Sequence, residues 1–230
     1  MATGAPRSRG GRITAAPRGR ERTRAKIGFV ATRLYLIRHA EHSLPQGTLA
    51  GRLPGVYLSE RGKAQARALA RHLAAARLAV VYSSPLERAR QTAELIAAPH
   101  RLPVSLLEAA LEIDFGGWQG KTFDELADDP HWRRWNETRS LARCPGGESM
   151  QEVQARFVDE LSAVVRRCEG LEVAVVSHGD PIRAAVAWWL GMPLDLIHRF
   201  EIAVGSVTIA DFSDGTPVLR TIGEVPAISS

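Results

Sequence analysis

Residues 34–39 read Leu-Tyr-Leu-Ile-Arg-His, an apolar run that ends in a cation and an imidazole. A continuous apolar run of this kind predicts a strand buried on both faces of a parallel sheet. Residues 41–58 follow with two prolines and three glycines and predict a long loop. Ligands of open α/β sheets bind in the crevice at the carboxyl ends of the strands. We therefore expect Arg38 and His39 to lie at a binding crevice.

Arg38 and His39 have the chemistry of a phosphate site. A guanidinium group gives two parallel charge-assisted hydrogen bonds to phosphate, and a neutral imidazole can attack phosphorus. We interpret His39 as a residue that becomes transiently phosphorylated. A strand-end pair on the surface, with no function, is the alternative.

The rest of the chain alternates strands with helices. Apolar runs predict three more strands, at residues 78–82, 103–107 and 173–176. Caps and apolar periodicity predict long helices that start at Ser59, Ser84, Met150 and Asp180, and short ones near residues 123–126 and 131–135. At Ser84 we expect an N-cap, with Pro85 in the first turn and Glu87 completing a capping box. The order predicts an α/β fold with a mostly parallel sheet, made mixed by a terminal hairpin of residues 206–212 and 217–222.

The net charge of +5 belongs to the N-terminal end of the 230-residue chain. Residues 1–26 hold eight Lys and Arg and one acid, whereas the remainder holds 22 basic and 24 acidic residues. The folded part is therefore not basic, and we expect no nucleic-acid contact by the core. Residues 1–31 lack apolar periodicity and predict a disordered basic extension. The folded domain is predicted at 32–224, with a tail at 225–230.

Cysteine usage and hydropathy exclude several classes of protein. Cys144 and Cys168 lack CxxC or Cys/His spacing, so they indicate neither a disulfide framework nor a zinc site. No apolar run is long enough to span a bilayer, and the N-terminus lacks the apolar stretch of a secretory signal. We expect a cytoplasmic protein with no membrane contact, no metal and no cofactor.

Arg88 and His178, like Arg38 and His39, come at or just after the end of a predicted strand. Arg88 lies in the first turn of a helix after a strand, where backbone N–H groups and the helix dipole favour an anion. A solvent-exposed arginine paired with a neighbouring glutamate is the alternative. His178 comes directly after the strand at 173–176 and Ser177. A capping or core histidine is the alternative there.

Residues 108–114 offer the carboxylates. Glu112 lies between two apolar residues, so partial desolvation would raise its pKa toward the range of a general acid. Glu108 and Asp114 are rivals, and spacing alone does not choose among the three. Two arginines, two histidines and one acid fit phosphoryl transfer, because spread cations stabilise its charge and keep His39 neutral.

Six ordered motifs together resemble the histidine phosphatase superfamily, which has the phosphoglycerate mutase-like fold. They are residues 38–41 (Arg-His-Ala-Glu, similar to Arg-His-Gly-Glu), 58–66, 84–93, 112–120, 145–149 and 177–179. The resemblance covers roughly residues 33–212. Its acid motif, Glu-x-x-Phe-Gly-x-Trp-x-Gly, favours Glu112 over the two rivals.

The resemblance implies a three-layer α/β/α fold with a mostly parallel mixed sheet, closest to the bacterial phosphatase and α-ribazole phosphatase-type members. It implies that His39 is the nucleophile and Glu112 the general acid. Arg38, Arg88 and His178 would bind the phosphate, with His178 also counted as catalytic. The implied reaction is metal-independent hydrolysis of a small phosphorylated substrate.

Some positions depart from the family pattern. Ala40 replaces the usual glycine, His42 stands where Ser or Thr is common, and Pro45 stands where Asn is often found. These changes affect the loop that would contact phosphate. Gln46 and Thr48 are the candidates to replace the missing contact.

Two other functions remain open. A phosphoglycerate mutase-type phosphomutase is one, and a non-catalytic module that binds a phosphorylated ligand is the other. Mutases of the family carry a longer insert after the second-arginine motif and an Asn after the second His-Gly, where this chain has Asp180, so hydrolysis is favoured. The presence of both histidines, both arginines and Glu112 argues against the non-catalytic module.

Three minor features complete the interpretation. Trp132 and Trp135 either wall a pocket for an aromatic substrate or serve as core or lid residues. Residues 116–122 end like a Walker A motif, but Phe115 occupies the position of its first glycine. The edge strand of the terminal hairpin makes a homodimer possible.

Overall fold

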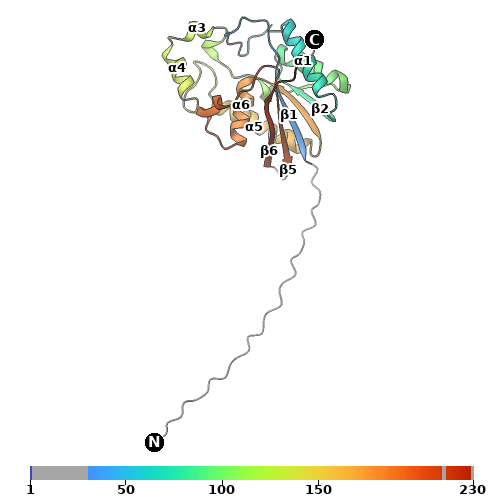
Figure 1. Ribbon diagram of the computed structural model, residues 1–230. Helices are drawn as coiled ribbons and strands as arrows, with labels where there is room; N and C mark the ends of the chain where they lie inside the picture. Colours follow the sequence, from blue (N-terminus) through green and yellow to red (C-terminus); the bar gives the residue numbers. More distant parts are fainter. Residues whose placement is uncertain (2–30, 214–215, 229–230) are drawn as a thin grey trace.

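The computed structural model describes Met1, residues 31–213 and residues 216–228. In this part of the chain, one six-stranded sheet has helices on both faces (Figure 1). The strands are β1 (Thr32–Arg38), β2 (Leu78–Ser83), β3 (Val104–Leu106), β4 (Glu172–Ser177), β5 (Val207–Ser213) and β6 (Thr216–Glu224). The α-helices are α1 (Glu60–His72), α2 (Glu87–Ala97), α3 (Phe123–Leu126), α4 (Pro130–Glu137), α5 (Met150–Arg167) and α6 (Gly179–Trp189). The 3₁₀ helices are η1 (Ala98–His100), η2 (Glu108–Ala110), η3 (Gly116–Trp118) and η4 (Leu194–Arg199).

The sheet has the order β3-β2-β4-β1-β5-β6. The pairs β3-β2, β2-β4 and β4-β1 are parallel, whereas β1-β5 and β5-β6 are antiparallel. The mostly parallel mixed sheet expected from the sequence is therefore confirmed.

β1 sends its side chains alternately to two apolar cores. Leu34 and Leu36 pack with residues of α5 and α6, and Tyr35 and Ile37 pack with residues of α1 and α2. All four side chains are buried. A strand covered on both faces needs apolar residues at every position, which explains the uninterrupted run in the sequence. The three-layer α/β/α arrangement is confirmed.

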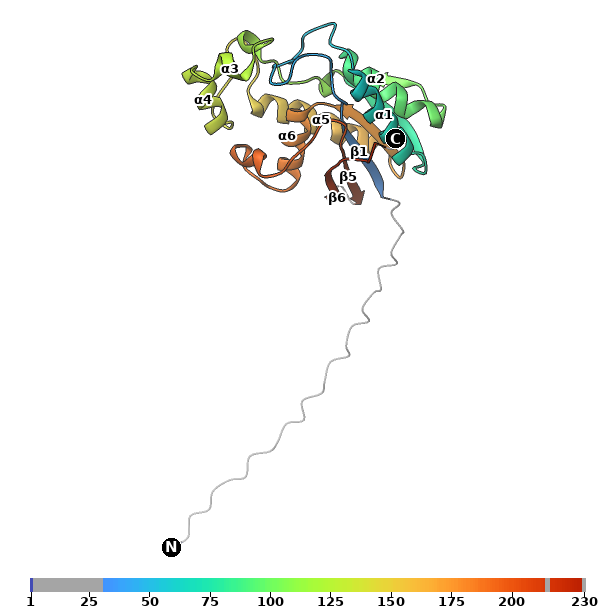
Figure 2. The same ribbon diagram turned by 45° about the horizontal axis from the view of Figure 1, so that its top comes forward.

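A third apolar cluster lies under α3 and α4, which occupy the side of the molecule opposite α1 and α2 (Figure 2). Trp118 and Trp135 are buried in it against Met150 and Val153 of α5. Trp135 is thus a core residue, which is one of the two roles expected from the sequence. Trp132 packs against the edge of this cluster and also lines the cavity at the carboxyl ends of β1 and β4, so it does wall a pocket.

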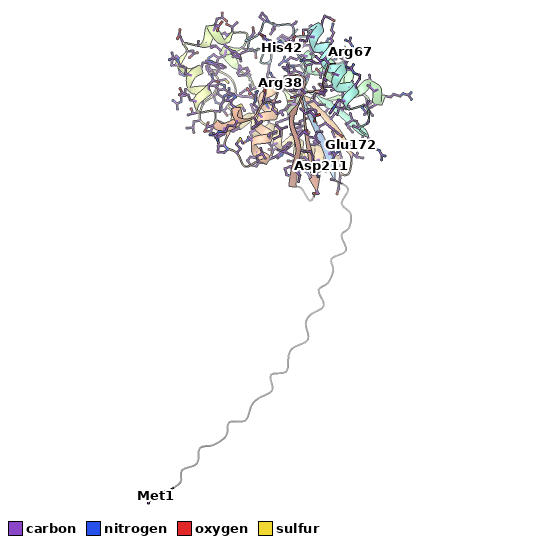
Figure 3. The ribbon with its side chains drawn as sticks, viewed as in Figure 1. Met1, Arg38, His42, Arg67, Glu172 and Asp211 are labelled. Atoms are coloured by element: carbon purple, nitrogen blue, oxygen red, sulfur yellow. The ribbon has the colours of Figure 1, made fainter. Side chains whose placement is uncertain are left out.

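The register of the sheet brings the two histidine motifs together. Arg38 pairs with Ser177 across the parallel β1-β4 ladder, so the next residues, His39 and His178, leave neighbouring strands side by side. Figure 3 shows Arg38 at the opposite end of the sheet from Glu172, which begins β4. The crevice therefore lies at the carboxyl ends of the parallel strands, where such folds bind ligands.

The predicted helix start at Ser84 is wrong. α2 begins at Glu87, after Leu86 in extended backbone, and it has no side-chain cap. The Ser84 Oγ lies 2.8 Å from the Nε2 of His178, and the Glu87 carboxylate accepts a hydrogen bond from the Gly55 N–H at 3.0 Å. Both side chains of the expected capping box are thus taken by tertiary partners. The predicted N-cap at Ser59 is confirmed, because its side chain accepts from the Gly62 N–H.

Some predictions fall outside the described residues. These are the extension up to residue 30, the turn at Asp214-Gly215 and the last two residues of the tail. β1 begins at Thr32 and β6 ends at Glu224, and we keep 32–224 as the proposed domain. None of the helices described between residues 31 and 228 is long and apolar enough to cross a membrane.

Candidate active site

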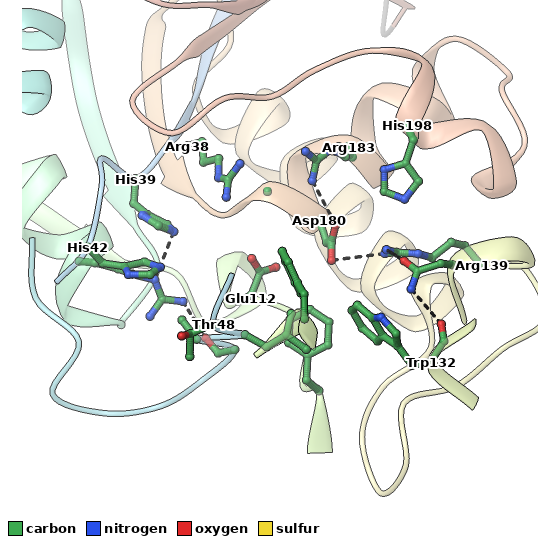
Figure 4. Close-up of a pocket in the computed structure, with 18 residues that line it drawn as sticks. Arg38, His39, His42, Thr48, Glu112, Trp132, Arg139, Asp180, Arg183 and His198 are labelled. Atoms are coloured by element: carbon green, nitrogen blue, oxygen red, sulfur yellow. Dashed lines mark hydrogen bonds and ion pairs between the residues drawn. The ribbon is translucent and has the colours of Figure 1, made fainter. Parts of the chain in front are cut away.

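A cavity of about 500 Å³ opens at the carboxyl ends of β1 and β4 (Figure 4). Four of the predicted site residues line it, namely Arg38, His39, Arg88 and Glu112. The fifth, His178, lies just behind them, with its ring 5.0 Å from the ring of His39. The structure therefore gathers all five at one place, from segments up to 140 positions apart in the chain.

His39 is held in a single tautomer. Its Nδ1 lies 2.7 Å from the Ala40 carbonyl oxygen, which can only accept, so Nδ1 carries the proton. The lone pair of Nε2 then accepts a hydrogen bond from the Arg88 Nε at 3.2 Å. Burial, Arg88 and Arg38 hold the pKa of His39 well below its usual value. The imidazole is neutral, and its nucleophilic nitrogen faces a cation.

Arg88 is a buried cation with spare donors. Its Nη2 donates to the Gly51 carbonyl at 2.7 Å, whereas its buried Nη1 has no hydrogen-bond partner in the part of the chain that the structure describes. Burial lowers the pKa of Arg88 to about 10, so it remains charged at neutral pH. A buried charge with an unpaired N–H favours an incoming anion.

Arg38 repeats this arrangement on the other side of His39. Its Nη1 donates to the Ile202 carbonyl at 2.7 Å, and its buried Nε has no hydrogen-bond partner within residues 31–213 and 216–228. Burial and the nearby Arg183 lower the pKa of Arg38. Both guanidinium groups line the same cavity as His39, and guanidinium groups form strong charge-assisted hydrogen bonds to phosphate.

His178 connects the site to Ser84. Its Nδ1 lies 3.2 Å from the Arg88 Nη2, and its Nε2 lies 2.8 Å from the Ser84 Oγ. Since an arginine can only donate, Nδ1 is the acceptor and Nε2–H donates to the hydroxyl. Burial followed by Arg88 holds the pKa of His178 well below its usual value. Sequence reasoning missed this contact because it assigned Ser84 to a helix cap.

Glu112 is the only one of the three candidate carboxylates that lines the cavity. Burial, followed by the charge of Asp180, raises its pKa to about 7, against the opposing effects of the Ile113 N–H and Arg88. Asp114 instead accepts a hydrogen bond from the Gly116 N–H at 2.9 Å, and Glu108 is exposed at the start of η2. A carboxyl with a pKa near 7 can exchange a proton in either direction at neutral pH.

A half-buried ion-pair network positions the Glu112 segment, and the sequence did not single it out. Arg52 and Arg156 donate to the Glu112 carbonyl oxygen at 2.8 and 3.3 Å. Both arginines also bind the carboxylate of Glu148, which in turn accepts from the Asp114 N–H. Glu148 lies in the matched motif 145–149, which was the one signal that pointed to this network.

The structure shows which side chains of the loop at 41–58, where the sequence departs from the family pattern, reach the cavity. Thr48 lines the cavity, as does His42, whose ring lies 5.8 Å from that of His39. Gln46 is exposed and does not line it. Of the two candidates to replace the missing loop contact, only Thr48 is in position.

Two other sequence features have no part in the cavity chemistry. Residues 116–122 form η3 and the capping residue Thr122 of the four-residue α3 rather than a phosphate-binding loop after a strand. In the chain segments that the structure covers, no group of three or more His, Cys, Asp or Glu side chains is placed to hold a metal ion.

The far end of the cavity carries a second charged group that sequence reasoning also missed. Arg139, Asp180, Arg183 and His198 line it. These four residues come from three separate segments, a loop, α6 and η4. No short sequence pattern therefore contains them together.

Comparison with known proteins gives consistent results. The sequence profile of the histidine phosphatase superfamily (branch 1) matches residues 34–225. Phosphoserine phosphatase 1 of Hydrogenobacter thermophilus is 39% identical over 190 residues, which cover 81% of this chain and 90% of that protein. The chain spans only about half the length of three mycobacterial relatives, with 54% of each covered at 37% identity.

Solved structures agree with this assignment. A variant of a phosphoserine phosphatase from Entamoeba histolytica, in complex with phosphoserine, has a TM-score of 0.76 at 30% identity, covering 84% of this chain and 98% of that one. The α-ribazole phosphatase of Shigella flexneri has a TM-score of 0.75 at 26% identity, covering 84% and 97%. The fold, the ordered motifs and the profile match together show that this chain belongs to branch 1 of the histidine phosphatase superfamily.

Proposed function

We propose that this protein is a phosphatase that hydrolyses small phosphomonoesters through a phosphohistidine intermediate on His39. The observation that carries the proposal is the Nε2 of His39. It is unprotonated, buried, and 3.2 Å from a guanidinium nitrogen of Arg88. A nucleophile beside cationic donors is what phosphoryl transfer needs, since the transition state spreads charge over the phosphoryl oxygens.

In the first step, the Nε2 of His39 attacks phosphorus and the bond from phosphorus to the leaving oxygen breaks. Glu112 donates its proton to that oxygen, so an alcohol leaves. Arg38 and Arg88 hold the phosphoryl oxygens with N–H groups that lack partners among the described residues. His178 accepts a hydrogen bond from Arg88 through Nδ1 and donates to Ser84 through Nε2, so its part is to position Arg88 for the phosphoryl group.

In the second step, water attacks the phosphorus of phosphohistidine. Glu112, now ionised, accepts the proton of that water, and the phosphorus–nitrogen bond breaks. Phosphate leaves, and the Nε2 of His39 regains its lone pair. The pKa of about 7 suits Glu112 to both tasks, because the two ionisation states are nearly equal in free energy at neutral pH.

Relatives support the reaction class. Curated relatives include proteins named phosphoserine phosphatase and acid phosphatase. One relative, 30% identical, is named a probable phosphoglycerate mutase, so mutase activity is the alternative that an experiment must separate. A mutase would depend on a bisphosphoglycerate and would interconvert phosphoglycerates faster than it hydrolyses them.

The purified protein is expected to hydrolyse p-nitrophenyl phosphate in the presence of excess chelator at the rate found without it. The reason is that Arg38 and Arg88 supply the positive charge next to His39 that a metal ion would otherwise provide. Release of p-nitrophenolate measures the rate. Loss of activity with chelator, restored by a divalent cation, would contradict the proposal of metal independence.

Two further proposals concern the setting of the protein. Cys144 and Cys168 are buried free thiols, which fits the cytoplasmic location expected from the sequence. β6 is an edge strand of the sheet, and a homodimer through this edge remains a prediction that sedimentation or light scattering can check.

A further inference from the structure

The end of the cavity away from His39 is lined by a compact cluster of charged side chains. Arg139 and Arg183 stand on either side of Asp180, with nitrogen–oxygen distances of 3.5 and 3.3 Å (Figure 4). Arg139 is only 5% exposed. It comes from the loop between α4 and α5, whereas Arg183 and Asp180 are on α6. The phosphoryl-transfer steps make no use of this cluster.

The charges of the cavity do not balance without a ligand. Its ionisable lining consists of four arginines, Asp180, Glu112 and three histidines. With the histidines neutral and Glu112 protonated for the first step, the lining carries a net charge of +3. A phosphomonoester brings a charge of about −2. One unit of positive charge is left over, at the end that holds Arg139 and Arg183.

The hydrogen bonds of the cluster are also incomplete. Arg139 donates from Nη2 to the Asn136 side chain at 3.1 Å, and its Nη1 is the nitrogen that lies 3.5 Å from Asp180, an ion pair without a hydrogen bond. The buried Nε atoms of Arg139 and Arg183 have no hydrogen-bond partner among the residues that the structure describes. The Arg139 guanidinium packs on Trp135, with its carbon 4.6 Å from the ring centroid. Stacking on a buried ring orients the guanidinium plane, and unpaired buried donors favour an acceptor from a ligand.

Asp180 is not placed to bind a substrate cation. Its two carboxylate oxygens face Arg139 and Arg183, and these guanidinium groups outweigh burial and lower the pKa of Asp180. The carboxylate therefore stays ionised and holds the two arginines in place. The cluster of Arg139, Arg183 and Asp180 therefore has a net positive charge, which favours binding of an anion.

The second cluster is close to the phosphate site. A Cβ added to Gly179 would stand 3.1 Å from the Arg183 Nη1 and 3.3 Å from the Arg38 Cζ. The two guanidinium groups therefore flank the same glycine, one belonging to each end of the cavity. A short carbon skeleton can span from a phosphate on Arg38 to a second anionic group on Arg183.

We propose that Arg139 and Arg183 form a carboxylate subsite, so that the preferred substrates are small phosphomonoesters whose alcohol part carries a carboxylate. The proposal rests on the proposed phosphatase function and names its substrate class. A planar carboxylate fits an arginine fork through two parallel hydrogen bonds. It also supplies the single negative charge that the phosphate leaves unmatched.

Pairs of esters that differ at the carboxylate test the proposal. O-phosphoserine and O-phosphoethanolamine share the phosphate and the ammonium, and only phosphoserine has the carboxylate. 3-Phosphoglycerate and glycerol 3-phosphate form a second pair without an ammonium. In each pair the carboxylate is expected to raise kcat/KM about 30- to 1,000-fold, the range for a desolvated charge pair.

The variant Arg139→Gln assigns that preference to the subsite. It is expected to lower the ratio of kcat/KM for phosphoserine over phosphoethanolamine about 100-fold, and Arg139→Lys, which keeps the charge, should recover part of it. Arg134→Gln is the matched control, because Arg134 is exposed on α4 and does not line the cavity. A merely structural role of Arg139 would lower both rates together and leave the ratio unchanged.

Several outcomes overturn the proposal. One is equal turnover of both members of each pair, and another is an Arg139→Gln variant in which both rates fall together and the ratio does not change. In either case the phosphatase function itself would stand. If no ester were hydrolysed, the proposed phosphatase function would be wrong. The subsite could then still be tested by equilibrium binding: tighter binding of phosphoserine than of phosphoethanolamine would support it, and equal binding would contradict it.

Discussion

Replacement of His39 by alanine is expected to lower kcat/KM for p-nitrophenyl phosphate by about 10⁴- to 10⁶-fold, the size of effect seen when a covalent nucleophile is removed. His178 also accepts a hydrogen bond from Arg88, but among the described residues only His39 both bonds to Arg88 through a neutral nitrogen and lines the cavity. Steady-state kinetics at enzyme concentrations high enough to detect slow turnover would measure the loss.

The control for this variant is His72→Ala, which removes an exposed histidine at the end of α1 and should leave the rate within about twofold. The His39→Ala protein should still bind inorganic phosphate, because Arg38 and Arg88 keep their unpaired N–H groups. Turnover of His39→Ala near the wild-type rate, with the variant folded, would rule out His39 as the nucleophile.

Replacement of Glu112 by glutamine is expected to lower kcat/KM by an amount that depends on the leaving group of the substrate. For an alkyl phosphate, whose alkoxide needs a proton to leave, kcat/KM should fall about 10²- to 10⁴-fold. For p-nitrophenyl phosphate the loss in kcat/KM should be less than about tenfold, because p-nitrophenolate leaves without protonation. Glu108→Gln is the control, since Glu108 is exposed and lies outside the cavity.

The same carboxyl sets a pH dependence. Glu112 acts as an acid only while protonated, so kcat/KM of the wild type for the alkyl phosphate should fall as the pH rises through about 7. On the acid side the rate should hold to well below 6.5, because the lowered pKa keeps His39 neutral there. The glutamine variant should lose the decline near 7 while the ionisation of the substrate stays the same. An unchanged decline in Glu112→Gln would contradict the assignment.

The fold was predictable because local signals were strong and agreed with one another. The run at 34–37 must be apolar throughout when helices cover both faces of β1. Likewise, the periodicity of residues 150–168 follows from the burial of one face of α5. Where a local signal competed with a distant partner, prediction failed, as at Ser84, whose hydroxyl binds His178 instead of capping α2.

The phosphate end of the site was predictable for a different reason. Parallel strands place the residues that follow them at one edge, so His39 and His178 could be brought together from sequence. The choice of Glu112 came from the family motif, since its burial depends on contacts with distant segments. Arg139 and Arg183 carried no signal, because each looks like an ordinary helix or loop arginine until the fold places them around Asp180.

The most direct test of the account is identification of the phosphorylated residue. The Glu112→Gln variant should hydrolyse its intermediate slowly, so mixing it with p-nitrophenyl phosphate and quenching in alkali should trap the phosphoenzyme for peptide mass spectrometry. The account predicts a phosphoryl group on His39 that survives alkali and is lost in acid, as expected of a phosphorus–nitrogen bond. An acid-stable phosphoryl group on Ser84, or on any residue other than His39, would contradict it.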